Sequence, residues 1–139
     1  MNNVRNRGFS RVNFTRTARL DFQGVSYFPC KIRDLSLSGM YVFSRFAESL
    51  SACCQVLFTQ AGPGAVLTIR AMAKVVREDK DGVAVQFTSM MYDSYMFLQI
   101  ILLYEAPDPF AISLEYPDNC PFEILEQDTI YPGKSDAYQ

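Results

Sequence analysis

Alternating apolar and polar residues predict that most of this chain folds as short β-strands. In residues 12–22, Ala18, Leu20 and Phe22 share one face of an extended chain with charged residues between them. The same criterion predicts six strands, over residues 12–22, 25–33, 40–43, 53–59, 66–77 and 83–87. Pro29 predicts an edge or a bulge in the second strand, because proline cannot donate a ladder hydrogen bond. Short strands joined by tight turns indicate a mainly β fold, a small antiparallel barrel or sandwich.

The spacing of apolar residues changes after residue 87, and an apolar helix is predicted there. Residues 90–104 are apolar on nearly every side, and Thr88 or Ser89 precedes them as a candidate N-terminal cap. One surface of a small domain does not cover such a helix, so a second copy of the chain or its own tail could cover the rest. The most apolar stretch, Tyr95–Tyr104, is shorter than the about twenty residues that cross a bilayer, so no membrane span is predicted.

The tail, residues 105–139, combines prolines with large apolar residues. It holds five of the seven prolines, which exclude a long helix. It also holds aromatic and aliphatic residues that a disordered tail usually lacks. We therefore predict extended segments packed on the domain or on a partner, as far as about residue 131.

Charge is divided unevenly between the two ends of the chain. Residues 1–33 carry seven basic residues and one acid, and residues 105–139 carry eight acids and one lysine, within a net charge of −2. Either both ends are ordinary solvated surface, or a basic arm faces an anionic partner. On the second interpretation, the acidic tail could rest near the basic arm until the partner displaces it. The pI of about 5.1 argues against nucleic acid as that partner.

No pattern for metal binding or catalysis occurs in the sequence. The four cysteines form no CxxC pair and the chain has no histidine, so a zinc site is not expected. Cys53 and Cys54 would point to opposite faces of a strand, and the thiols are expected to be buried and reduced, as in a cytoplasmic protein. No nucleophile motif and no phosphate-binding GxxxxGK is present, so we predict a binding protein without a cofactor rather than an enzyme.

Two short stretches carry the candidate chemistry. RGFSR places Arg7 and Arg11 four residues apart ahead of the first strand, and DLSLSGM places Asp34, Ser36 and Gly39 between the second and third strands. Each alone has an ordinary interpretation, a solvated arm and a plain turn. Together, in this order and setting, RxxxR and DxSxxG resemble the PilZ domain, a bacterial receptor module for cyclic di-GMP, over about residues 5–104.

The resemblance implies both the fold and the ligand. The fold would be a six-stranded antiparallel split β-barrel closed by a C-terminal helix (residues 12–104), with a flexible arm ahead of it (residues 1–11) and the acidic tail outside it (residues 105–139). Cyclic di-GMP would order the arm against the turn and change a surface that an unidentified protein partner reads. The candidate ligand-binding residues are Arg7, Arg11, Asp34, Ser36 and Gly39, with Arg5, Asn6, Ser38 and Arg77 as further candidates.

The chemistry of these residue types suits the ligand. An arginine fork can bind phosphate oxygens, or the O6 and N7 atoms of guanine, with two hydrogen bonds, and its face can stack on a purine. Asp34 can accept hydrogen bonds from guanine N1 and N2, and Ser36 can add a hydroxyl contact. Gly39 allows the backbone to approach a ligand closely.

Several alternatives stay open. The chain could be a PilZ-like adaptor that binds proteins and no nucleotide, although such a module has no need for the two arginines, Asp34 and Ser36 together. Asn6 departs from the double-arginine form of the motif that is associated with two bound ligands, so one or two ligands per chain are both open. Arg77 could instead form an ion pair with the turn at residues 78–81. Residues 90–104 or the tail could form a homodimer. Four other basic residues could extend the positive field or simply occupy exposed strand faces: Arg16, Arg19, Lys31 and Arg33.

Overall fold

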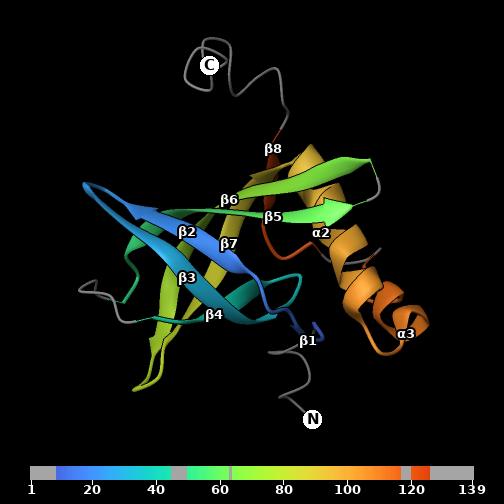
Figure 1. Ribbon diagram of the computed structural model, residues 1–139, viewed down its shortest axis with the longest axis horizontal. Helices are drawn as coiled ribbons and strands as arrows, with labels where there is room; N and C mark the ends of the chain where they lie inside the picture. The colour runs from blue at the N-terminus through green and yellow to red at the C-terminus, as the bar shows by residue number, and fades with distance from the viewer. Residues whose placement is uncertain (1–8, 45–49, 63, 117–119, 126–139) are drawn as a thin grey trace.

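The computed structural model describes residues 9–44, 50–62, 64–116 and 120–125. Within them the chain forms the elements β1 (Val12–Asn13), β2 (Thr17–Phe22), β3 (Val25–Leu35), β4 (Gly39–Phe43), β5 (Cys53–Gly62), β6 (Ala65–Glu78), β7 (Val83–Met91), α2 (Tyr92–Glu105), α3 (Pro109–Ser113) and β8 (Glu123–Leu125). Figure 1 shows the long strands crossing the molecule, with both helices on one side of them. Each of the six predicted strand segments is present, the first of them as two separate strands.

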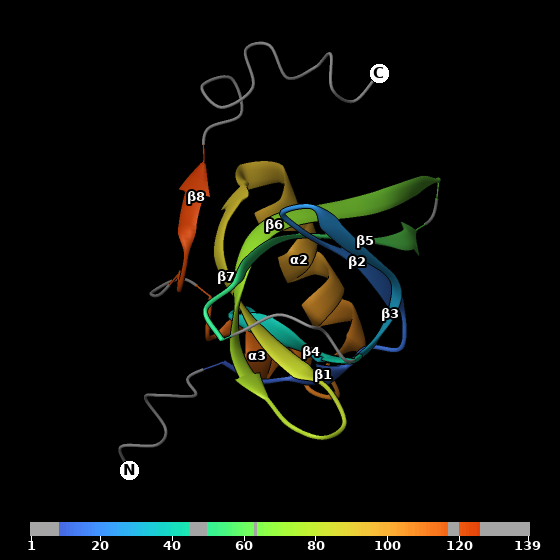
Figure 2. The same cartoon turned by 90° about the vertical axis from the view of Figure 1, so that its left-hand side faces the viewer.

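Six of the strands close into a ring. β2, β5, β6, β7, β4 and β3 pair in this order, all antiparallel, and β3 returns to pair with β2. In Figure 2 these strands curve around a common interior. One apolar core fills it, and its largest fully buried side chains include Phe14, Leu20, Ile69 and Phe87. The ring of strands followed by a helix confirms the predicted fold class.

The predicted first strand is divided into β1 and β2. β1 pairs with the end of β3, where Val12 lies opposite Leu35, whereas β2 pairs with the first part of β3 and with β5. The buried residues Val12 and Phe14 keep the same parity as Ala18, so the sequence pattern does not reveal the break. The division matters for the site, because β1 places residues 9–11 beside the end of β3.

β3 is two residues longer than predicted, and the turn after it is shorter. Asp34 and Leu35, predicted as the start of a turn, extend the strand because both β1 and β4 pair with them. The turn therefore comprises only residues 36–38, and β4 begins at Gly39. The predicted bulge near Pro29 is present as a register shift where β3 pairs with residues 18–20 of β2.

α2 begins later than predicted and lacks the predicted cap. Thr88 and Ser89 belong to β7, because β6 and β8 pair with this end of the strand. The N-terminal cap residue is Met91, which makes no side-chain hydrogen bond to the helix. Inside the first turn, the Ser94 hydroxyl accepts a hydrogen bond from the Arg70 backbone N–H of β6 at 3.0 Å. Pairing between distant strands thus extended β7 beyond the point where local capping signals predicted a helix.

The two sides of α2 differ in how well they are covered. Leu98, Ile101 and Leu102 are buried in the core of the ring. On the opposite side Ile100 is 47% and Tyr104 81% exposed, so the predicted uncovered face exists. Self-association through that face stays a prediction. Among the described residues, no helix is both long enough and apolar enough to cross a membrane.

The tail contributes a short helix and a strand to the fold. Asp108 caps α3 by accepting a backbone N–H hydrogen bond, and Ile112 of this helix is buried in the core. β8 pairs in parallel with the end of β7, and Phe122 just before it packs edge-on against Phe87 and Tyr95. The prediction of extended packed segments is therefore confirmed for β8 and wrong for α3, and the sheet is not purely antiparallel. The predicted end of the packed tail near residue 131 lies outside the described residues.

Cysteine exposure matches the prediction only in part. Cys53 is exposed and Cys54 buried, as predicted for neighbours on a strand, and Cys30 is also buried. Cys120 is exposed, so the expectation of buried thiols is wrong for Cys53 and Cys120. Burial raises the pKa of the Cys30 thiol, which keeps this sulfur protonated and unreactive.

Candidate ligand-binding site

The DxSxxG turn is held by Ser36, which is fully buried. Its backbone N–H donates to the carbonyl of Gly39 at 2.9 Å, and its hydroxyl oxygen accepts the backbone N–H of Ser38 at 3.2 Å. The hydroxyls of Ser36 and Ser38 also lie 3.1 Å apart. Serine hydroxyls favour such local bonds, which hold a turn in one conformation. Ser36 is therefore a structural residue of the turn as well as a candidate ligand contact.

Gly39 is required by the packing of two strands. A Cβ atom at this position would lie 2.1 Å from the carbonyl oxygen of Val85 in β7. Gly39 pairs with Gln86 of β7, and the adjacent Ser38 carbonyl accepts the Phe87 N–H at 2.8 Å. The backbone of Gly39 does not have a positive φ, so its conformation alone would admit other residues. The close approach predicted for Gly39 is thus made to β7, and an approach to a ligand stays a prediction.

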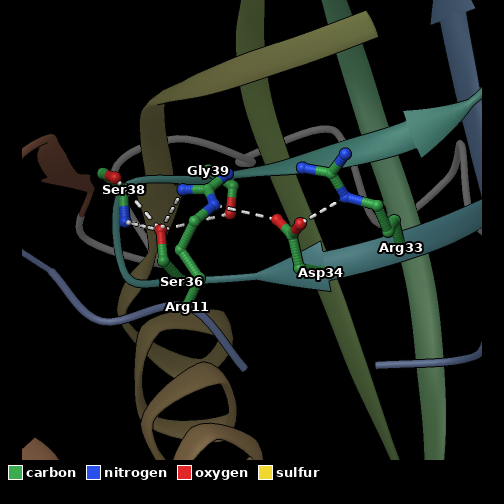
Figure 3. Close-up of polar contacts among 6 residues, drawn as sticks. All are labelled: Arg11, Arg33, Asp34, Ser36, Ser38 and Gly39. Carbon is green, nitrogen blue, oxygen red and sulfur yellow. Dashed lines mark hydrogen bonds and ion pairs between the residues drawn. The ribbon is translucent and has the colours of Figure 1, made fainter. Parts of the chain in front are cut away.

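Asp34 lies between two arginines at the end of β3 (Figure 3). Its Oδ1 accepts a hydrogen bond from Arg11 Nε at 2.8 Å, and its Oδ2 accepts one from Arg33 Nε at 2.7 Å. The carboxylate side chain is only 11% exposed, whereas the two arginine side chains are 41% and 44% exposed. A buried carboxylate is tolerated here because each of its oxygens has a cationic partner.

Arg11 connects the arm to the turn. In addition to its bond with Asp34, its Nη1 donates to the Ser36 hydroxyl at 3.1 Å. The structure therefore brings together three predicted site residues that are up to 25 positions apart in the sequence. Phe9, two residues before Arg11, is half-buried against the core. The candidates Arg5, Asn6 and Arg7 lie outside the described residues.

Arg33 is also a member of this network, and the sequence left its role open between extending the positive field and occupying an exposed strand face. Its Nε donates to Asp34 Oδ2 at the point where the pairing of β3 with β4 shifts register, at residues 32–34. The Arg33 guanidinium also lies 3.8 Å above the ring centre of Tyr41, a cation–π contact. No local sequence signal marks a bulge at this point.

A cavity of about 340 Å³ opens beside the turn. Its walls come from the arm (Phe9 and Arg11), the turn (Ser38), β6 (Arg77) and the tail (Pro121). The cavity thus joins the RxxxR and DxSxxG segments to β6 and to the tail, which the motifs alone did not implicate. The two arginines give it a positive character, which suits an anionic ligand.

Arg77 lies at the cavity and forms no ion pair within the described part of the chain. The predicted alternative, an ion pair with residues 78–81, is therefore not formed. Its guanidinium lies 5.8 Å from the ring centre of Tyr41, whose hydroxyl donates a hydrogen bond to Asp79. This hydrogen bond is the largest cause that lowers the pKa of Asp79, and the charge of Arg77 adds a smaller effect in the same direction.

A ring of antiparallel strands, with arginine, carboxylate and hydroxyl groups gathered beside a cavity, is the architecture of a binding domain. The family model for the PilZ domain matches residues 5–99. The chain therefore belongs to the PilZ family, a family of cyclic di-GMP receptors whose domains are binding or adaptor modules and not enzymes.

One solved structure supports the fold, and a second is reported only as a weaker likeness. The PilZ domain of CeSA from a cellulose-synthesizing bacterium is 18% identical and aligns over 68% of this chain and 93% of its own, with a TM-score of 0.50. An uncharacterized Legionella protein is 14% identical over 67% of this chain and 89% of its own, with a TM-score of 0.42. A search of curated protein sequences returns no significant match.

Proposed function

We propose that this protein is a cyclic di-GMP receptor that binds its ligand at the cavity beside the DxSxxG turn. The observation that carries the proposal is the network that joins Arg11, which lines that cavity, to Asp34 and Ser36. These residues belong to the two motifs of the family. Arg7 completes the site on the strength of the RxxxR spacing, and no cofactor or metal is required.

The ligand offers two phosphodiesters and two guanine bases, and the site offers a partner for each. The Arg11 fork can bind a phosphate or the O6 and N7 edge of guanine, and Arg77 across the cavity can bind a second anionic group. Asp34 can accept from guanine N1 and N2 once Arg11 releases its carboxylate and turns to the ligand, while Arg33 keeps its own bond to Oδ2. Ser38, half-buried at the cavity wall, can add a hydroxyl contact.

Signalling would follow from a change in the arm. Ligand binding would draw Arg11 and Arg7 onto the phosphates and fix the arm (residues 1–11) against the domain (residues 12–104). The altered surface would then be recognised by a protein partner, so the receptor acts as a switch without catalysis. Ordering the arm costs conformational entropy. The favourable free energy of the charge-assisted contacts must be larger than this cost.

A second candidate function is that of an adaptor that binds proteins and no nucleotide. The observation that favours it is that the site is already paired within itself. Both oxygens of Asp34 have arginine partners, and the Ser36 hydroxyl is bonded to Arg11. Such a network can hold the arm and turn together in the absence of any ligand.

Calorimetric titration of cyclic di-GMP into the purified protein separates the two functions. Wild type should bind, and Arg11→Ala and Asp34→Ala should each lose binding while remaining folded by circular dichroism. Arg19→Ala is the matched control, since Arg19 is an exposed arginine of β2 that pairs with Asp21. Its affinity should equal that of wild type. No heat from folded wild type would reject the receptor in favour of the adaptor, and the measured stoichiometry would decide between one and two ligands.

A further inference from the structure

The tail makes a specific contact with the ligand-binding arm. The backbone N–H of Ser10 donates to Oε1 of Glu115 at 2.9 Å, and the Ser10 hydroxyl donates to Oε2 of the same carboxylate. Ser10 stands between Phe9 and Arg11, inside the RxxxR motif. Glu115 lies beyond residue 99, where the match to the PilZ family ends. A residue outside the family domain thus binds the segment proposed to bind the ligand.

The Glu115 carboxylate is held on a well-anchored part of the tail. Its own backbone N–H donates to the carbonyl of Ile112 at 3.0 Å, and Ile112 is buried in the core. The hydroxyl of the next residue, Tyr116, donates to the carbonyl of Gln99 in α2 at 3.4 Å. Figure 1 shows α3 and β1 at the same end of the molecule, where this contact forms. The carboxylate therefore acts from a fixed position.

Three consecutive arm residues are held by three different parts of the protein. Phe9 packs on the core and lines the cavity, Ser10 is bonded to Glu115, and Arg11 is bonded to Asp34 and Ser36. In this arrangement Arg11 is hydrogen-bonded to the Asp34 carboxylate and the Ser36 hydroxyl, the groups that are candidates to bind guanine. Holding the backbone of Ser10 also holds Arg11 in that pairing.

We propose that Glu115 is a positioning residue that latches the arm in a closed, ligand-free arrangement and thereby opposes cyclic di-GMP binding. Two physical effects act in the same direction. The latch stabilises the state in which Arg11 is paired with Asp34, and ligand must displace that pairing. The carboxylate also places negative charge against Ser10, the neighbour of Arg11 in the arm, and at low salt this charge opposes the approach of a dianion. The latch is an observed contact, and its effect on affinity rests on the proposed function.

The overall charge pattern predicted a related contact of a different kind. The acidic tail and basic arm suggested attraction between carboxylates and arginines. The contact found is between one carboxylate and the amide and hydroxyl of Ser10, so its strength comes mainly from hydrogen bonds with defined geometry. Glu115→Gln, which removes only the charge, should therefore loosen the arm less than Glu115→Ala, which removes both acceptor oxygens.

The latch can be tested without any ligand. The chain contains no tryptophan, so Phe9→Trp introduces a single tryptophan at the docked arm, which can be excited selectively over the eight tyrosines. Adding Glu115→Ala should shift its emission to longer wavelength and increase its quenching by acrylamide. Glu115→Gln should give a smaller change, because an amide oxygen can still accept the Ser10 N–H. Glu123→Ala, which removes an exposed acid of the same tail, is the matched control and should change nothing.

Emission that does not respond to Glu115→Ala would overturn the latch. Because tryptophan could itself disturb the docking of the arm, the amide nitrogen and proton shifts of Ser10 should be compared by NMR in wild type and Glu115→Ala. An unchanged Ser10 amide signal would overturn the latch equally.

The effect on affinity is measured by titrating cyclic di-GMP into the full chain at low and at physiological salt. Glu115→Ala should bind about fivefold more tightly than wild type, the equivalent of roughly one net hydrogen bond. The gain should be larger at low salt, because removed charge repulsion contributes there. Equal or weaker binding by Glu115→Ala would overturn the proposed opposition to ligand. Absence of binding in wild type would reject the receptor function and this opposition together, while the fluorescence and NMR results would still decide whether the latch exists.

Discussion

Replacing Gly39 with alanine should destabilise the protein by about 2–4 kcal/mol in the absence of any ligand. The added Cβ would lie 2.1 Å from the Val85 carbonyl oxygen, whereas ordinary contact begins at 3.4 Å. β4 and β7 would have to separate locally by about 1.3 Å, the difference between these distances. Overpacking of this kind costs about 1–3 kcal/mol. The separation also stretches the Phe87 N–H to Ser38 carbonyl bond, a loss of about 1 kcal/mol.

Urea unfolding followed by far-ultraviolet circular dichroism would measure this change. Gly62→Ala is the matched control, because a Cβ there would lie 3.5 Å from the Ala65 carbonyl, an ordinary contact. Its free energy of unfolding should stay within about 0.5 kcal/mol of wild type. If Gly39→Ala unfolded at the same urea concentration as Gly62→Ala, the argument from strand packing would be refuted. If it is destabilised as expected, loss of ligand binding in this variant would not show that Gly39 touches the ligand.

Three further predictions follow from burial and charge. Burial, together with the hydrogen bond to Asp79, raises the pKa of Tyr41 to about 12. Tyr41 should therefore contribute stability below pH 10 that is lost as pH rises from about 10 to 12. In thermal melts across this range, Tyr41→Phe should lose less stability than wild type. Identical pH profiles for the two proteins would contradict the reasoning. With native protein, a thiol reagent should label Cys53 and Cys120 rapidly and the two buried thiols only on unfolding, and rapid labelling of all four would contradict the burial assigned to Cys30 and Cys54. Phe122→Ala should cost about 3 kcal/mol in urea unfolding, since its ring packs against the core, and a cost below about 1 kcal/mol would mean that the tail is not part of the folding unit.

The candidate site without ligand is a network of groups that satisfy one another. Asp34 and Ser36 are buried polar groups, and leaving either unpaired would be unfavourable. Arg11 and Arg33 supply the missing partners from exposed positions, so they can exchange a protein partner for a ligand partner without a large change in their own burial. On the proposed function, the free energy of binding would be a difference between two well-paired states. A modest contact such as that of Glu115 with Ser10 is therefore expected to shift the affinity.

The limits of prediction are clearest at the end of β3. Ser36 and Gly39 were recognised as parts of a motif from spacing alone, and the structure places Ser36 in the turn and Gly39 at the start of β4. Asp34 was assigned to the turn and lies in the strand, because both β1 and β4 supply it with a partner. For Arg33 the sequence left two roles open, and only the structure shows that it binds Asp34. Local patterns do not decide these points, since they do not show which segments pair with a strand or where the register of a pair shifts.

The sequence by itself determined where six strand segments lie, which residues of the first one face the core, and where two family motifs stand. These properties depend on the periodicity of apolar residues and on residue type, and both can be read from a short stretch of sequence. Only the tertiary structure decided that Arg11 binds Asp34 and Ser36, that β8 joins β7 in parallel, and that Glu115 binds the arm. Each of these contacts joins residues far apart in the chain. They form because closing the ring of strands and burying Ile112 and Phe122 bring those residues together.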